Sequence, residues 1–481
     1  MASLPGLNLA AASAEPANLT STSTETRQQD LAANTEYRFE VSFSRTLTIR
    51  LRTGTAEFFG TELGPSTTYS FKGTKGAIYT WHGCSLEIGG EAESEYVAEE
   101  TTMMSYANAH FALEDLRDKA MQSNEAGPRV LVVGPDNSGK TSLVRILTSY
   151  ALKMERQPVV VNLDPREGML SVPGSLTASA FSGILDVEEG WGSSPISGPS
   201  PIPVKMPLGY HYGLGNPEEG KLYKPLVTRM ALAVLSRLEE DKASKHTGFI
   251  IDTPGSISHG KGGVYENIDH IVSEFSGTCG VCFVGKLLTI SVNIIFVLGS
   301  ERLYSDLSRK YGHRSEDPIS VVRLDKSGGC VDRDEAYMKH FRQNQIHNYF
   351  FGTDAENTLA PYSLVADIGD LTIFRLAESS AVDPSFRPGD DDDDVYAASK
   401  NIYEKVNPSS AMQNSLLAVT TASPKDPQEV IRDASVQGYI YLIEVDETKK
   451  KVRVLVPQPG QLPPNALVLG SFPEVVPDLL N

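Results

Sequence analysis

One glycine-rich stretch constrains the fold of this chain more than any other. It runs from Gly134 to Ser142 and fits the pattern G-x-x-x-x-G-K-[ST]. Residues 129–133 in front of it are mostly valine and leucine, which is typical of a buried parallel strand. Residues 143–147 follow with the apolar spacing of a helix. Because strand, glycine loop and helix occur in this order, the stretch predicts a phosphate-binding loop in an α/β domain.

The residue types in this loop suit the phosphates of a nucleotide. Glycines let successive backbone N–H groups curl around a phosphate, and the N-terminus of the following helix adds positive potential. We expect Lys140 to reach the β- and γ-phosphates and Thr141 to bind a Mg²⁺ ion that bridges them. The predicted phosphate-binding residues are Gly134, Asn137, Ser138, Gly139, Lys140, Thr141 and Ser142.

Further apolar stretches predict the other strands of a doubly wound parallel sheet. They lie at 159–164, 249–253, 292–298 and 319–324. Ligands of such sheets bind at the carboxyl ends of the strands, where Asp164 and Asp252 fall. Either aspartate is a candidate to hold Mg²⁺, directly or through water, or to orient an attacking group. The alternative is that each aspartate simply caps a helix.

The rest of the chain divides around this nucleotide-binding domain, which we place at 107–355. Alternating residues with regular Gly, Pro and Ser turns predict an N-terminal β-sandwich at 31–106. Strand patterns joined by a hairpin turn at 448–450 predict a small β-rich C-terminal domain at 356–481. Residues 1–30 are expected to be a disordered polar tail and not a signal peptide.

Composition narrows the classes of partner. The 481 residues carry a net charge of −18, so RNA contact would need a local basic groove or a basic partner. The aspartate-rich loop 388–395 is interpreted as a solvated surface loop, with a partner contact as the alternative. Four cysteines are too few for a secreted disulfide framework and indicate a reducing compartment.

Several motifs together resemble a known family. The chain is similar to the fungal subunit of cleavage factor IA in pre-mRNA 3′-end processing, within the polynucleotide 5′-hydroxyl-kinase superfamily. The resemblance runs from about Tyr37 to the C-terminus. Its markers are the glycine loop and the stretches Glu57–Leu63, Val172–Gly174, Glu301–Tyr304, Lys326–Gly329 and Ile440–Val456.

The resemblance implies a site shared between domains. In the family the N-terminal domain packs over the base of ATP, and the matching positions here are Glu36, as a hydrogen-bond acceptor, and Lys75. The implied partners are the large scaffold subunit of cleavage factor IA, which binds the polymerase II tail, and other 3′-end processing factors. Pre-mRNA would be reached mostly indirectly, the implied location is the nucleus, and no membrane is involved.

One departure from the family pattern removes a catalytic group. Active RNA kinases of this superfamily carry D-x-D-x-G-Q after the second strand. The first aspartate corresponds to Asn162 here, and an amide cannot take a proton from an RNA 5′-hydroxyl. Arg166 and Glu167 replace the glycine and the glutamine of the pattern, while Asp164 is kept.

Two further departures weaken substrate contacts. Ser256 stands where active relatives place a tryptophan, which is able to stack on a substrate base. The lid region 338–348 keeps Arg342 but has Lys339 and Gln345 where active relatives offer further arginines. Fewer guanidinium groups mean weaker stabilisation of a phosphoryl-transfer transition state.

Two hypotheses of function follow. In the first, the chain is an assembly subunit that holds ATP and Mg²⁺, turns ATP over slowly or not at all, and thereby stabilises a partner-binding conformation. In the second, it is an active RNA 5′-hydroxyl kinase that uses Asp164 as the catalytic base. A GTPase-like switch is a third reading, because 252–255 resembles the D-x-x-G motif, yet no guanine signature N/T-K-x-D is apparent.

Residues 277–291 do not fit the family spacing. Cys279 and Cys282 within this stretch have the spacing of a redox or metal pair, but the chain offers no second pair. Together with the next strand the stretch has roughly the length of a membrane span, although 292–298 already has a place in the sheet. Our hypothesis is that 277–291 is a translated in-frame intron.

Overall fold

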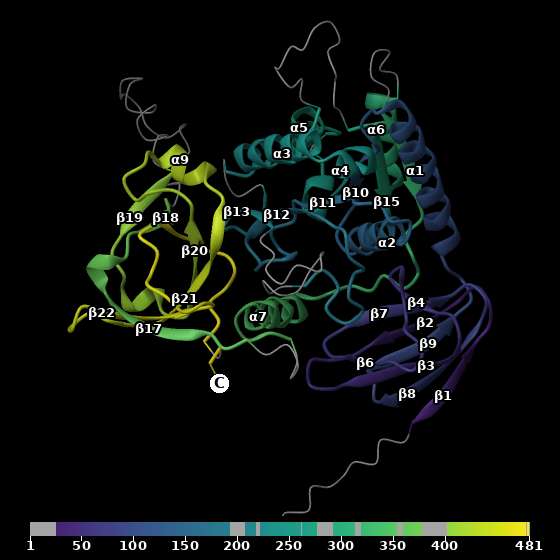
Figure 1. Ribbon diagram of the computed structural model, residues 1–481, viewed down its shortest axis with the longest axis horizontal. Helices are drawn as coiled ribbons and strands as arrows, with labels where there is room; N and C mark the ends of the chain where they lie inside the picture. Colours follow the sequence, from purple (N-terminus) through teal and green to yellow (C-terminus); the bar gives the residue numbers. More distant parts are fainter. Residues whose placement is uncertain are drawn as a thin grey trace, which may run out of the picture.

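The chain folds into three domains around one helix, α7. The computed structural model describes residues 26–192, 207–217, 222–260, 262–276, 292–312, 319–353, 359–377, 402–477 and 479–480. Figure 1 shows the N-terminal sandwich and the C-terminal domain on either side of α7 (Glu335–Phe351), with the central sheet above it. The predicted fold class is confirmed, because a β-sandwich, a parallel α/β sheet and a β-rich domain follow one another in the chain.

The N-terminal domain is a sandwich of two antiparallel sheets, with strand orders β1-β8-β3-β6 and β5-β4-β7-β2-β9. Phe39, Phe58 and Phe71 meet in its core with ring centroids 5.0–6.1 Å apart. Strand β1 lies partly within the stretch that we expected to be a disordered tail, so the sandwich begins before residue 31. The strands are β1 (Arg27–Leu31), β2 (Thr35–Glu40), β3 (Leu47–Gly54), β4 (Glu57–Phe58), β5 (Thr61–Glu62), β6 (Thr68–Phe71), β7 (Lys75–Thr80), β8 (Cys84–Gly90) and β9 (Ser94–Ala98).

The central sheet has the order β13-β12-β11-β14-β10-β15-β16 within the described residues. The stretch from β11 to β16 is parallel, and its strands are the ones that the sequence predicts. The antiparallel edge strands β12 and β13 were not predicted, because β12 consists mostly of small residues and β13 has only 4 residues, one of them glycine. The strands are β10 (Arg129–Val133), β11 (Val159–Asn162), β12 (Ser175–Ala180), β13 (Leu208–His211), β14 (Phe249–Asp252), β15 (Ile294–Leu298) and β16 (Ser320–Leu324).

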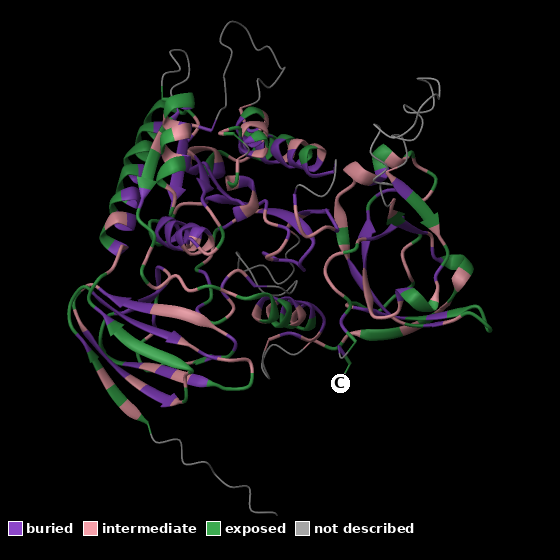
Figure 2. Cartoon of the chain, turned by 180° about the vertical axis from the view of Figure 1, so that it is seen from behind, coloured by how far each residue is buried: buried purple, intermediate pink, exposed green. Residues whose placement is uncertain are grey.

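Helices cover both faces of this sheet. Residues of α1 and α2 share an apolar core with one face, and residues of α3, α5 and α6 share a second core with the other. The inner strands β11, β14, β10 and β15 between them are buried, as Figure 2 shows by its colours, whereas the edge strand β16 is mostly exposed. The helices are α1 (Met103–Ser123), α2 (Lys140–Lys153), α3 (Tyr223–Glu240), α4 (Lys242–Thr247), α5 (Glu266–Glu274) and α6 (Glu301–Tyr311), with the 3₁₀ helix η1 (Gly255–Ser258).

The C-terminal domain is built on one sheet with the order β17-β22-β21-β20-β23-β18-β19 in the described part of the chain. The predicted hairpin between β21 and β22 is present, and the Asp446 carboxylate caps its turn by accepting the Lys449 N–H at 2.9 Å. Its elements are β17 (Tyr362–Asp367), η2 (Ile368–Asp370), β18 (Ile373–Leu376), β19 (Tyr403–Val406), η4 (Ser410–Met412), β20 (Ser415–Thr420), α9 (Gln428–Asp433), β21 (Val436–Asp446), β22 (Lys451–Val456) and β23 (Leu467–Leu469).

Two of the sequence hypotheses concern stretches outside the described residues. These are the proposed intron at 277–291 and the acidic loop at 388–395. Of the helices that the structure does describe, none is apolar over a length that would cross a membrane.

One buried polar contact joins the sandwich to the central domain. The Tyr150 hydroxyl of α2 donates a hydrogen bond to the Glu57 carboxylate of β4, and both side chains are buried. Burial raises the pKa of Glu57 above its ordinary value, although the hydrogen bond from Tyr150 opposes that rise. The pair therefore links the sandwich to α2, beside a second buried contact between the Thr61 and Ser149 hydroxyls at 3.3 Å.

We expect Tyr150→Phe to lower the free energy of unfolding by about 1–3 kcal/mol, because a buried carboxylate loses a donor. Urea unfolding of the wild type, Tyr150→Phe, Glu57→Gln and the double variant measures this as a double-mutant cycle. Strictly additive losses would show that the two groups do not interact.

Candidate nucleotide-binding site

A cavity of about 840 Å³ lies between the sandwich, the central domain and α7. The sandwich contributes Glu36 and Lys75, and the central domain contributes residues 137–142 of the glycine loop. The structure thus brings together all of the predicted site residues except Gly134, which is not part of the lining. The cavity is also lined by Asn162, Asp164, Glu167, Asp252 and Arg333.

The glycine loop has a backbone conformation that requires glycine at two positions. Gly134 has φ +157°, and a Cβ there would lie 2.4 Å from the Leu298 carbonyl oxygen. Gly139 has φ +86° and forms the N-cap of α2, where a Cβ would lie 2.7 Å from the Cys330 Sγ. Gly134 therefore shapes the loop from outside the cavity, while the α2 N-terminus supplies the anion-binding end of the helix.

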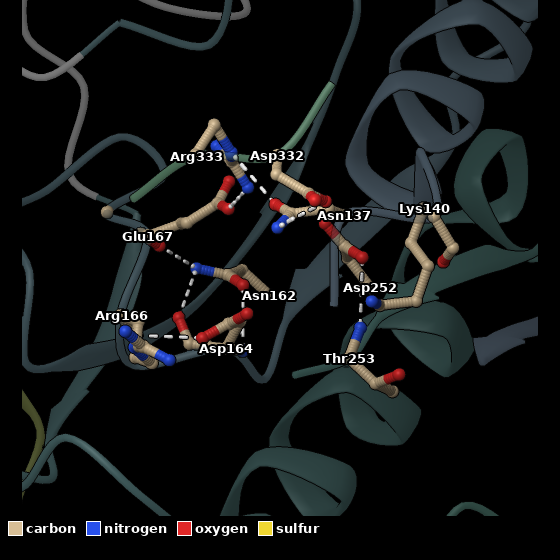
Figure 3. Close-up of polar contacts among 12 residues, drawn as sticks. Asn137, Lys140, Asn162, Asp164, Arg166, Glu167, Asp252, Thr253, Asp332 and Arg333 are labelled. Carbon is tan, nitrogen blue, oxygen red and sulfur yellow. Dashed lines mark hydrogen bonds and ion pairs between the residues drawn. The ribbon is translucent and has the colours of Figure 1, made fainter. Parts of the chain in front are cut away.

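Lys140 is buried at the start of α2, and its ammonium group points back toward the glycine loop. Its Nζ donates a hydrogen bond to the Pro135 carbonyl oxygen at 2.9 Å. Thr141 beside it is hydrogen-bonded through its side chain to the Asp252 carboxylate. Figure 3 shows Lys140 and Asp252 on one side of the site and Asp164 and Glu167 on the other.

The negative charge of the carboxylates around Lys140 is only partly compensated by positive charge. Burial, together with the charge of Glu167, raises the pKa of Asp164 to about 7. Burial also raises the pKa of Asp252 to about 6, against the opposing hydrogen bond from Thr141. A divalent cation would compensate these negative charges, and hydroxyl and carboxylate oxygens are the ligands that Mg²⁺ prefers. Thr141, Asp164 and Asp252 therefore fit a magnesium site.

Asn162 holds the turn that follows β11. Its Oδ1 accepts the backbone N–H of Asp164 at 2.9 Å, and its Nδ2 donates to the carbonyl oxygens of Glu167 at 2.7 Å and of Asp164 at 3.2 Å. A carboxylate at this position could accept but not donate. The amide that departs from the kinase pattern is thus a structural support for the turn carrying Asp164.

Arg333 is a site residue that the sequence analysis missed. Its guanidinium pairs with the Glu167 carboxylate, and its Nε lies 3.5 Å from the Asn137 Oδ1 of the glycine loop (Figure 3). Burial raises the pKa of Glu167, but the charge and hydrogen bond of Arg333, together with the charges of Lys140 and Arg166, hold that pKa below its ordinary value. The only sequence signal was the position of Arg333 just before the lid region.

The sandwich residues of the site are already paired within the protein. Glu36 is buried and accepts hydrogen bonds from the Arg38 Nε at 2.7 Å and from the Thr101 hydroxyl. Lys75 donates to the Glu40 carboxylate at 2.6 Å, and its Nζ lies 5.1 Å from the centre of a tyrosine ring on α7. Both line the cavity as predicted, and their contact with ATP stays a prediction.

Family models match nearly the whole described chain. An N-terminal β-sandwich domain of polyadenylation factor matches residues 30–120. An mRNA cleavage and polyadenylation factor CLP1 P-loop model matches 134–352, and a pre-mRNA cleavage complex II protein Clp1 model matches 359–474. The chain belongs to the Clp1 family.

Curated relatives agree over the full length. The chain is 66% identical to an mRNA cleavage and polyadenylation factor CLP1 of Phaeosphaeria nodorum, with 100% of both chains covered. It is 51% identical to the clp1 factor of Botryotinia fuckeliana, again over 100% of both chains. The match to the Emericella nidulans clp1 factor is 43% identical and covers 98% of each chain.

Solved structures of Clp1p share the fold. A structure of the wild-type Clp1p–Pcf11p complex aligns with a TM-score of 0.79 and 29% identity, covering 93% of this chain and 98% of that chain. A second has a TM-score of 0.78 and 29% identity, and covers 93% of this chain and 99% of the other. It is described as showing an extended Pcf11p–Clp1p interface and the structural basis for ATP loss in a glycine-to-arginine mutant. Together with the P-loop model, these matches support nucleotide binding by the family fold.

In this Clp1-family chain the one lid arginine is turned away from the cavity. Arg342 is 1% exposed and donates to Glu335 at 2.6 Å and to Glu474 at 3.1 Å. Its guanidinium also lies 5.2 Å from the centre of the Phe472 ring. Gln345, one turn later, donates to the Gly168 carbonyl oxygen at 2.9 Å. Arg342 therefore joins α7 to the C-terminal domain and does not line the cavity, whereas Gln345 lines the cavity and carries no charge for a phosphate.

The raised pKa of Asp164 predicts a pH-dependent stability of the nucleotide-free protein. The folded state keeps the Asp164 proton up to about pH 7, whereas an unfolded aspartate loses it near pH 4. Stability therefore falls as the pH rises through this window. Asp164→Asn cannot ionise, so we expect it to be about 1–3 kcal/mol more stable than the wild type at pH 8 and to differ less at pH 5.

Urea unfolding at the two pH values, without nucleotide or metal, measures this difference. Asp115→Asn removes an exposed carboxylate of α1 and serves as the matched control. Equal differences between Asp164→Asn and the wild type at pH 5 and pH 8 would contradict the assignment.

Proposed function

We propose that this chain is the ATP-binding subunit of the pre-mRNA 3′-end cleavage and polyadenylation machinery, in which ATP acts mainly as a structural ligand that supports partner assembly. The observation that carries this proposal is a nucleotide-sized cavity shared by the sandwich, the central domain and α7. A ligand in such a cavity contacts more than one domain and stabilises their arrangement.

The residues of the cavity suit a bound magnesium nucleotide. We assign the phosphates to residues 137–142, Mg²⁺ to Thr141 and Asp164, with Asp252 alongside, and the base end to Glu36 and Lys75. Bound Mg²⁺ compensates the charge of the buried carboxylates, and the bound phosphates compensate the charge of Lys140. Binding thus relieves an electrostatic cost of the folded chain.

The same residues argue against fast phosphoryl transfer. Asn162 is occupied as a hydrogen-bond donor in its own turn, and Arg342 is buried against Glu335 and Glu474. Glu167 stands paired with Arg333 where the kinase pattern has glutamine. Asp164 alone among these positions matches the kinase pattern. It would be the catalytic base in the alternative function, which is that of an RNA 5′-hydroxyl kinase.

For the partner, we propose the scaffold subunit of cleavage factor IA that binds the polymerase II tail. The support is that the similar Clp1p structures were solved with Pcf11p. Pre-mRNA and other processing factors would be reached through that subunit, because a net charge of −18 disfavours direct RNA binding. The proposed location is the nucleus, where pre-mRNA is processed.

Loss of the loop lysine is expected to empty the site. Lys140→Ala removes a charge-assisted contact to phosphate, so we expect ATP affinity to fall about 10- to 100-fold and bound nucleotide to be lost during purification. Chromatography of the nucleotide released from denatured protein measures occupancy, and co-purification with the scaffold subunit measures assembly. Lys153→Ala, at the exposed end of α2, is the matched control. Full occupancy in Lys140→Ala would contradict the assignment.

A kinase assay separates the two functions. With radiolabelled ATP and an RNA that has a 5′-hydroxyl end, we expect no end-labelling above that of heat-denatured protein, because the positions of the catalytic pattern are used structurally. Labelling that the wild type produces and Lys140→Ala or Asp164→Asn abolishes would establish the kinase instead.

A further inference from the structure

Helix α7 contacts the two outer domains through its ends. Near its start, the Tyr337 hydroxyl donates to the Gly73 carbonyl oxygen of the sandwich at 2.9 Å. Near its end, the Tyr349 hydroxyl accepts the backbone N–H of Tyr439 in the C-terminal domain at 3.0 Å. Figure 1 shows α7 between these domains, so a shift of the helix reaches both.

A row of polar contacts and ion pairs runs from the glycine loop to α7. It begins at Asn137, which lies beside Arg333, and Arg333 pairs with Glu167. The neighbouring residue in the same turn, Arg166, pairs with Glu335 in the first turn of α7 at 2.9 Å. The turn after β11 therefore carries contacts to the phosphate end of the cavity on one residue and to α7 on the next.

The row continues from α7 into the segment that follows β23, at residues 472–474. Glu335 is shared, because it also accepts from the buried guanidinium of Arg342 at 2.6 Å. Arg342 in turn pairs with Glu474 and covers the ring of Phe472. Both of these residues follow β23 of the C-terminal domain. These contacts thus form a path between the glycine loop and the C-terminal domain, in which Glu167 and Arg166 are linked as neighbours in the chain.

We propose that Glu335 and Arg342 are positioning residues that couple nucleotide occupancy of the glycine loop to the docking of the C-terminal domain. This inference rests on the proposed function, since it requires ATP to bind at the loop.

Competition between negative charges supplies the physical cause of the coupling. Arg333 has Glu167 as its carboxylate partner and lies next to the loop, so nucleotide phosphates compete with Glu167 for it. Release of Glu167 changes the charge environment of the turn that it shares with Arg166. This in turn changes how strongly Arg166 competes with Arg342 for the Glu335 carboxylate. Because coupling is reciprocal, weaker docking must also weaken ATP binding by the same factor.

Hydrogen–deuterium exchange of the full chain, with and without ATP and Mg²⁺, tests the coupling. In the wild type we expect ATP to slow exchange in β20 and β21 about fivefold or more, which is the low end of usual coupling factors. Glu335→Gln, at an exposed side chain, should abolish this slowing and raise the calorimetric Kd for ATP by the same factor.

A second ion pair between the same two domains provides the matched control. Arg229 of α3 pairs with Asp433 of α9 at 2.6 Å and has no link to the glycine loop through the contacts above. Arg229→Gln should therefore keep the ATP-dependent slowing, even where basal exchange rises. The proposal is overturned where ATP protects the glycine loop but leaves β20 and β21 unchanged, or where Glu335→Gln keeps the full effect. Absence of any protection at the glycine loop would overturn the proposed function, and the coupling with it.

Discussion

The structure depends on the balance of buried charge around the glycine loop. Lys140 faces Asp164 and Asp252, and Arg333 faces Glu167, in a cavity lined by the sandwich and by the central domain with α7. Buried carboxylates are tolerated only where a partner charge, a hydrogen bond or a proton compensates them. Arg333 compensates Glu167, whereas the two aspartates are left with raised pKa values. A cation and a nucleotide at this point would complete the balance and hold the surrounding domains together.

Residues at the positions of the kinase pattern have structural roles in this chain. Asn162 uses both sides of its amide to hold a turn, which a carboxylate cannot do. Arg342 is fully buried between α7 and the C-terminal segment, so moving it to a phosphate would leave Glu474 without its partner. Asn162 thus stabilises its own turn and Arg342 stabilises the contact between α7 and the C-terminal domain, which favours a ligand that is held over one that is consumed.

Much of the fold was predictable because local pattern and tertiary environment agree. The parallel strands around β10 are continuous apolar runs, and such runs are buried on both faces. Strand β12 escaped prediction because small residues such as those of Ser175–Ala180 have no strong strand preference, and β13 escaped because it is short and contains a glycine. Strand β1 escaped for the same reason, since its polar residues pair with β8 only once the sandwich has formed.

The sequence by itself determined the nucleotide loop, because G-x-x-x-x-G-K-T depends on local backbone freedom and on residues adjacent in the chain. It also indicated the departures at Asn162 and in the lid. Only the tertiary structure decided what those residues do instead. Arg333 meets Glu167 across 166 positions of sequence, and Arg342 meets Glu474 across 132. Pairings over such distances are set by how domains pack, which no local pattern encodes, because either charge alone reads as an ordinary surface residue.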